Sequence, residues 1–139
     1  MSKLRLSLPA IILLAAVARG EPEAFLYPQT EAFRAQLDAA RSRGLTLTDY
    51  HIHIRGGMTP QKAAERQEQS GIRSAVLENF GREWPLSNNV ALATFIDACS
   101  LARADGRPLP IGIQVNDRDW YKQIDPAVLK RLDYVLADT

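Results

Sequence analysis

Hydrophobic and polar positions along the chain follow two periods in turn. Alternating or continuous apolar residues predict strands at residues 45–54, 72–79, 109–116 and 133–138. Apolar residues at helical spacing predict helices at residues 27–44, 59–71 and 87–106, with a short helical segment after Pro126. Strands that alternate with helices of this size are typical of βαβ units, so the sequence predicts an α/β fold with a parallel sheet.

The first two helices carry local boundary signals. Thr30 and Thr59 are candidate N-caps, and Pro60 occupies the first helical position after Thr59. Gly44 and Gly71 stand where these helices should end, because glycine readily adopts the left-handed conformation found after a helix. These signals predict the helix boundaries independently of the apolar stripes.

Composition limits the classes of function. The 139 residues are 46% hydrophobic, which is enough for one domain with a core. The formal net charge of +1 provides no basic surface for nucleic acid, so we expect a small-molecule substrate. The single cysteine, Cys99, excludes an internal disulfide and lies in an apolar helical stripe, where we expect inert core packing.

The first residues differ from the rest of the chain. Two basic residues precede a long apolar run that ends in small residues, as in a secretory signal peptide. We therefore expect residues 1–18 to be removed and the mature protein to be secreted or periplasmic, with no membrane span after cleavage. A buried N-terminal helix is the alternative, but Pro9 argues against it. Residues 19–44 then form a helical lead-in, and residues 45–139 form the main fold.

Both histidines of the chain lie in the first predicted strand, two residues apart. Because successive side chains of a strand point to opposite faces, Asp49, His51 and His53 are expected to project together near its carboxyl end. Two neutral imidazoles at this spacing can reach one divalent ion, and a carboxylate such as Asp49 can hold a ring N–H. The alternative is a pair of ordinary strand histidines bonded to backbone or water. The shared face and the acid favour a site for zinc, manganese or iron.

The sequence DYHIH at residues 49–53, followed by TPQKAAERQEQSGI at residues 59–72, resembles the first strand and helix of the polymerase and histidinol phosphatase (PHP) domain. It is similar, more distantly, to metal-dependent amidohydrolases. The resemblance implies the first four βα units of a (β/α)7–8 TIM-like barrel, with divalent metals at the carboxyl ends of the strands. A closed barrel of this kind needs about 250 residues, so we expect the chain to be the N-terminal part of a longer protein. The alternative is an open four-stranded sheet that completes itself as a homo-oligomer.

Three positions depart from the PHP pattern. The loop after the histidines, residues 55–57, lacks the acid of that family, and the second strand ends in Glu78 and Asn79 instead of Thr-Asp-His. Gln114 stands in place of a metal-bridging glutamate. The resemblance implies Glu78 as a ligand or base, and Gln114 only as a neutral oxygen donor or a polar lining residue. Without a bridging carboxylate to hold two cations close together, we expect one metal ion.

Two loops that follow neighbouring strands share a composition. Each comes after an asparagine at a strand end and presents an arginine, an acid and a tryptophan. Arginine suits a carboxylate or phosphate, and indole offers a flat apolar platform for a sugar ring or a base. The alternative is that each tryptophan packs over its own loop and each arginine pairs with the adjacent acid. If this rim binds substrate, the expected residues are Arg82, Trp84, Gln114, Asn116, Arg118 and Trp120.

These observations together predict an exported metal-dependent hydrolase. His51 and His53 would hold the ion, Asp49 would orient them, and Glu78 or Asp138 would act on the water that the ion activates. Asp138 ends the fourth predicted strand, where alternation leaves its facing undecided. A phosphoester, and hence an anionic small molecule, suits the family likeness and the rim arginines best, and a cyclic amide or a carboxylated sugar is the alternative substrate. The alternatives are a metal- or ligand-binding domain that has lost catalysis and a purely structural α/β domain.

Overall fold

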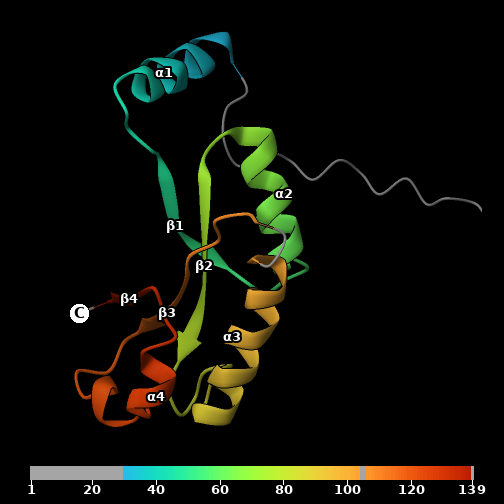
Figure 1. The fold of residues 1–139 in the computed structure, drawn as a ribbon. Coiled ribbons are helices and arrows are strands. Elements are labelled where there is room, and N and C mark those ends of the chain that lie inside the picture. The colour runs from blue at the N-terminus through green and yellow to red at the C-terminus, as the bar shows by residue number, and fades with distance from the viewer. Residues whose placement is uncertain (1–29, 104–105, 139) are drawn as a thin grey trace, which may run out of the picture.

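The computed structural model describes residues 30–103 and 106–138, so the expected signal peptide lies outside the described residues. The fold is α/β, with four parallel strands in one sheet (Figure 1), which confirms the predicted class. No helix among these residues is long and apolar enough to cross a membrane. The elements are α1 (Glu31–Ser42), β1 (Thr48–His53), α2 (Pro60–Ser70), β2 (Arg73–Phe80), α3 (Asn89–Arg103), β3 (Ile111–Val115), η1 (Trp120–Lys122), α4 (Pro126–Leu129) and β4 (Tyr134–Ala137).

The boundaries of the first two helices follow the local signals in the sequence. The hydroxyl oxygen of Thr30 accepts a hydrogen bond from the backbone N–H of Phe33 at 3.2 Å, and Thr59 caps Lys62 in the same way at 3.2 Å. Gly71 ends α2 in the left-handed conformation, with φ of 73°. Each cap satisfies a backbone group that the helix itself leaves without a partner, which is why these predictions are confirmed.

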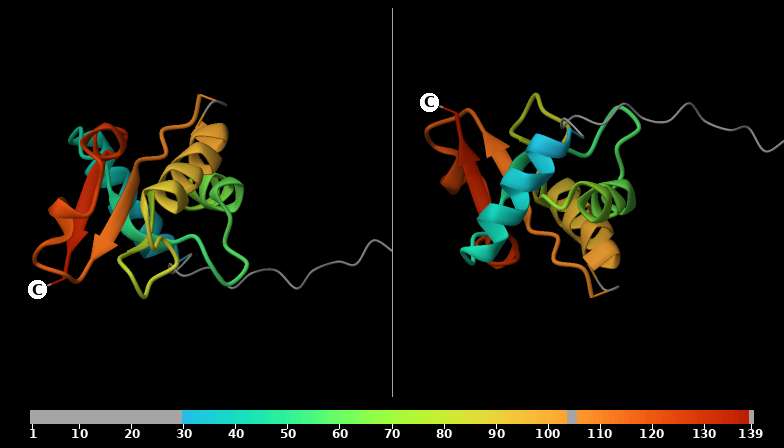
Figure 2. Two further views of the ribbon diagram at one scale, coloured as in Figure 1. Left: turned by 90° about the horizontal axis from the view of Figure 1, so that it is seen from below. Right: turned by 90° about the horizontal axis from the view of Figure 1, so that it is seen from above.

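The strands follow one another in the sheet in the order β1-β2-β3-β4, and the helices after β1 lie on one side of it. The sheet is curled into a half-barrel, with α2 and α3 against its convex side and α1 beyond the amino-terminal ends of the strands (Figure 2). A doubly wound sheet would instead reverse its strand order and carry helices on both faces. The arrangement is compatible with consecutive βα units of a TIM-like barrel. Cys99 is fully buried in the core between sheet and helices, where burial raises the pKa of its thiol to about 12, as expected for inert packing.

Strand β1 contains an irregularity that the sequence did not predict. Asp49 pairs with Ser74 of β2, and Ile52 pairs with Val76. Between these two pairs β1 contains one residue more than β2, which is a β-bulge. Such a bulge interrupts the regular alternation of side chains, and the register places Asp49 on the face of the core residue Ile52. Regular alternation therefore does not by itself place Asp49 with both histidines, and its orienting role toward them stays a prediction. The Asp49 carboxylate accepts the backbone N–H of His51 at 2.9 Å and so supports the bulge.

One aromatic side chain crosses the concave face of the sheet. The ring of Tyr134 in β4 lies over Gly112 in β3, where an added Cβ would come within 2.5 Å of the ring. Its hydroxyl donates a hydrogen bond to the backbone carbonyl of Tyr50 in β1 at 3.1 Å, and the two tyrosine rings pack edge to face at 5.2 Å. Burial raises the pKa of the Tyr134 hydroxyl well above its usual value, so it remains protonated as a donor. Tyr134 thus connects the two edge strands across the curl.

We expect Gly112→Ala to lower the free energy of unfolding by about 1–3 kcal/mol, because the new methyl group overlaps the Tyr134 ring. Urea denaturation followed by circular dichroism measures this loss. In a Tyr134→Ala background the same Gly112→Ala change should cost much less, because the overlapping ring is gone. Equal costs in the two backgrounds would contradict the proposed contact.

Candidate functional site

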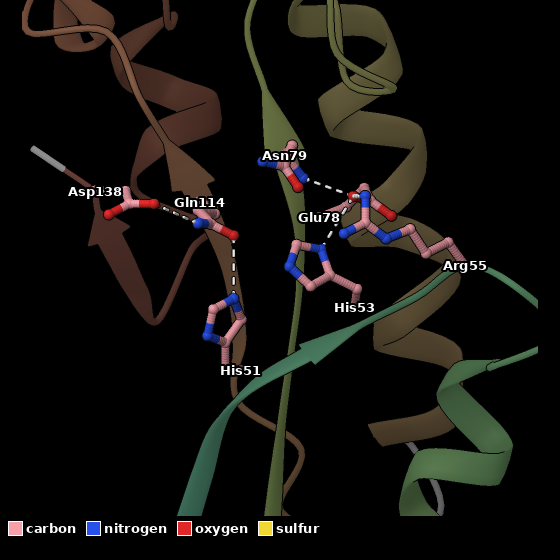
Figure 3. Close-up of polar contacts among 7 residues, drawn as sticks. All are labelled: His51, His53, Arg55, Glu78, Asn79, Gln114 and Asp138. Atoms are coloured by element: carbon pink, nitrogen blue, oxygen red, sulfur yellow. Dashed lines mark hydrogen bonds and ion pairs between the residues drawn. The ribbon is translucent and has the colours of Figure 1, made fainter.

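The two histidines lie side by side at the carboxyl end of β1. Their ring centroids are 5.1 Å apart, and the ring planes are tilted by 46°. The side chain of His53 is only 15% exposed, whereas His51 lies open at the concave face. Each ring turns to a different polar partner, His53 to Glu78 of the neighbouring β2 and His51 to Gln114 of β3, one strand further on (Figure 3).

The carboxylate of Glu78 holds the ring of His53. Glu78 Oε1 lies 3.2 Å from His53 Nδ1, accepts the backbone N–H of Asn79 at 2.8 Å and lies 3.6 Å from Arg55 Nη1. A carboxylate can only accept from a neutral imidazole, so Nδ1 carries the proton and Nε2 keeps its lone pair. In Figure 3 this nitrogen points toward the side of the site where His51 and Gln114 lie. Glu78 thus has the orienting position that the sequence assigned to Asp49.

Gln114 connects Asp138 to His51. Its amide nitrogen donates to Asp138 Oδ2 at 3.4 Å, and its amide oxygen lies 3.2 Å from His51 Nε2. Because the Asp138 carboxylate only accepts, the amide must turn its nitrogen toward Asp138 and its oxygen toward His51. His51 Nε2 is then the donor. These contacts settle the facing of Asp138, which lies on the concave side with the histidines (Figure 3).

Asn79 places a second amide on the same face as Gln114. The two residues pair in the register of β2 and β3, and parallel partners share a face. Asn79 is only 5% exposed, and its Oδ1 has no hydrogen-bond partner among the described residues. A buried amide oxygen without a partner is costly in a purely structural role. It suits a position where a ligand or ion supplies the missing contact.

The donors at this face can be compared with the needs of a divalent ion. Within residues 30–103 and 106–138, no group of three His, Cys, Asp or Glu side chains is arranged to hold one. The 3.2 Å between His51 Nε2 and Gln114 Oε1 is nevertheless close to the separation of two ligands on a tetrahedral zinc ion, about 3.3 Å for bonds of about 2.05 Å. If an ion replaced the proton on His51 Nε2, these two atoms and Nε2 of His53 would offer it two imidazoles and a neutral amide oxygen. They do not supply the carboxylates that a closely spaced pair of ions requires.

The two rim loops are not equivalent. A pocket of about 600 Å³ lies between the loop after β2 and the loop after β3, at the carboxyl-terminal rim of the sheet. Arg82, Trp84 and Asn116, three of the residues expected at the rim, line it, and the indole of Trp84 also packs against Gly81 of its own loop, as in the packing alternative. Arg118 is exposed outside the lining, and Trp120 packs against the hydrophobic core, as in the packing alternative. The lining also includes Glu83, the acid of the first loop, and residues that the sequence did not single out, namely Phe80, Gly81, Asp117 and Gln123.

Comparison with protein-family models gave no match, and neither did comparison with curated proteins or with solved structures. The resemblance to the PHP domain therefore rests on the sequence of the first strand and helix alone.

The hydrogen bonds at this face predict the tautomers of both histidines. In metal-free protein, at a pH where the rings are neutral, His53 should carry its proton on Nδ1 and His51 on Nε2. The 15N chemical shifts of the imidazole nitrogens distinguish these forms, and the chain has only these two histidines. Glu78→Ala should abolish the preference at His53 and leave His51 unchanged as an internal control. A wild-type His53 protonated on Nε2 would contradict the assigned role of Glu78.

Proposed function

We propose that the protein is a metal-dependent hydrolase that uses one divalent ion, such as zinc, manganese or iron. His51 and His53 would hold the ion, with Gln114 as a neutral oxygen donor. The observation that supports this most is the pair of adjacent imidazoles, one of which is fixed by Glu78 with its Nε2 free. When bound, a divalent ion lowers the pKa of a bound water toward neutrality and polarises the bond to be cleaved.

Asp138 is better suited than Glu78 to move a proton in this reaction. The carboxylate of Glu78 is buried and already contacts His53, Arg55 and the backbone of Asn79. Asp138 is exposed at the open face, and within the described part of the chain its carboxylate accepts the long 3.4 Å hydrogen bond from Gln114. A base has to accept a proton from water at the site and release it again, which requires a carboxylate with free lone pairs. We therefore assign Glu78 to positioning and Asp138 to proton transfer.

The charge of the donor set supports an anionic reacting group. His51, His53 and Gln114 are all neutral ligands, so they leave the charge of a divalent ion uncompensated. A phosphoester brings negative oxygens that would complete both the charge balance and the coordination. The signal-like pattern of residues 1–18 supports export of such an enzyme.

A second candidate function is a metal- or ligand-binding domain without catalysis. It is favoured by Gln114, which stands where a bridging carboxylate would be expected, and by the commitment of Glu78 to His53 and Arg55. Both functions require the histidines, so metal binding alone does not separate them.

We expect purified metal-free protein to bind one equivalent of Zn²⁺ or Mn²⁺, measured by isothermal titration calorimetry. His51→Ala and His53→Ala should each weaken binding by about 100-fold or more, because each removes a direct ligand. Tyr121→Ala removes an exposed aromatic side chain from a neighbouring loop and should leave binding unchanged. Unchanged binding in both histidine variants, or two equivalents in the wild type, would contradict the proposal.

Turnover separates the enzyme from the binding domain. With added manganese or zinc, the wild type should hydrolyse p-nitrophenyl phosphate. Asp138→Asn should lower kcat by about 10²–10⁴-fold at unchanged metal stoichiometry, because proton transfer is lost and the metal ligands remain. Steady-state kinetics with calorimetry on the same samples measures both quantities. Metal binding by the wild type without turnover of any aryl phosphate would favour the second candidate.

A further inference from the structure

The pocket at the rim has one wall built on a rigid loop. Two backbone hydrogen bonds close the loop between β2 and α3. The N–H of Gly81 donates to the carbonyl oxygen of Leu86 at 3.1 Å, and the N–H of Trp84 donates to the carbonyl oxygen of Gly81 at 2.9 Å. The indole of Trp84 lies against the backbone of Gly81, where an added Cβ would be 2.9 Å from the ring. Trp84 remains 40% exposed. The loop thus holds a flat apolar surface in place and leaves it accessible from the pocket.

The opposite wall is polar and also preorganised. The side chain of Asp117 accepts hydrogen bonds from Gln123 Nε2 at 2.6 Å and from the backbone N–H of Asp119 at 2.9 Å. Asn89 at the start of α3 donates to the backbone carbonyl of Gln123 at 3.2 Å. Asn116 completes this wall. These bonds fix several donors and acceptors opposite the indole, which reduces the entropy lost when a ligand is ordered.

The charges of the lining decide which ligand fits. The pocket contains one cation, Arg82, and two carboxylates, Glu83 and Asp117. An excess of negative charge disfavours an anion, whereas a ring with many hydroxyl groups can donate to carboxylates and accept from a guanidinium. The carboxamides of Asn116 and Gln123 can both donate hydrogen bonds to hydroxyl groups and accept hydrogen bonds from them. A volume of about 600 Å³ lies within the range of sites for small molecules, about 300–1,000 Å³.

We propose that this pocket binds an uncharged saccharide ring, stacked on Trp84 and hydrogen-bonded to Arg82, Asn116 and Asp117. The saccharide would be the part of the substrate that does not react, and in that respect the inference rests on the proposed hydrolase function. The pocket and the histidines lie at the same rim, so one sugar-containing phosphoester could occupy both. Binding at the pocket itself requires no metal.

The test measures sugar binding to metal-free full-length protein in the presence of EDTA. Glucose, galactose, N-acetylglucosamine and maltose are titrated at millimolar concentrations, with saturation-transfer NMR for affinity and tryptophan fluorescence for location. At least one of these sugars should bind, and it should change the emission of the wild type and of Trp120→Phe. Trp84→Ala should abolish the emission change and weaken affinity about tenfold or more. Arg82→Ala should weaken it several-fold, whereas Arg118→Ala, an exposed arginine of the neighbouring loop, should not.

Several results would overturn the inference. These are no binding of any of the four sugars, equal affinity in Trp84→Ala with an unchanged circular dichroism spectrum, or equal effects of Arg82→Ala and Arg118→Ala. Tighter binding of inorganic phosphate than of every sugar would show that the pocket prefers anions and would also overturn it. Because no metal is present, these failures are distinct from failure of the hydrolase proposal, which is measured by metal binding and turnover.

Discussion

The curl of the sheet depends on the contact between Tyr134 and Gly112. A side chain on residue 112 would occupy the space of the tyrosine ring, so the absence of a side chain there allows β4 to fold over the concave face. The ring ends at the backbone of Tyr50, within the irregular part of β1. The bulge and the crossing tyrosine are therefore parts of one arrangement. Together they bring the first and last strands close enough for residues of both to face one polar site.

The polar site at the concave face requires several polar side chains to be buried away from water, which is energetically unfavourable. Glu78, Asn79 and Gln114 are all more than nine-tenths buried, and they lie at the carboxyl ends of strands whose other residues form an apolar core. Burying such groups is unfavourable unless each finds a partner. Glu78 and Gln114 find theirs in the histidines and in Asp138, but Oδ1 of Asn79 has no partner within residues 30–103 and 106–138. Asn79 lies at the carboxyl end of β2, where parallel α/β folds bind their ligands.

The sequence predicted best what local interactions determine. The caps at Thr30 and Thr59 need only neighbouring backbone, and the order of strands and helices follows from hydrophobic period. The bulge was missed because the Asp49 carboxylate accepts the backbone N–H of His51, and this hydrogen bond competes with regular strand pairing. The alternation of apolar and polar residues in the strand does not reveal such a bond. Contacts between distant segments determine which face of the sheet Asp138 lies on. They also determine that Trp84 lines the rim pocket while Trp120 packs against the core. Such contacts are set by register and packing, which alternation alone cannot fix.

The histidine site and the rim pocket are connected through the backbone of one residue, Asn79. The backbone N–H of Asn79 donates to Glu78, which holds His53, while the carbonyl of Asn79 accepts the N–H of Leu86 at the end of the pocket loop. A ligand that moves this loop would therefore act on the residue that orients the imidazole. Under the two proposals, strands would fix the reacting groups and a loop would fix the recognition surface, an arrangement common in enzymes built on parallel sheets. Here the end of β2 couples the two, so occupancy of the pocket and alignment of His53 should not be independent.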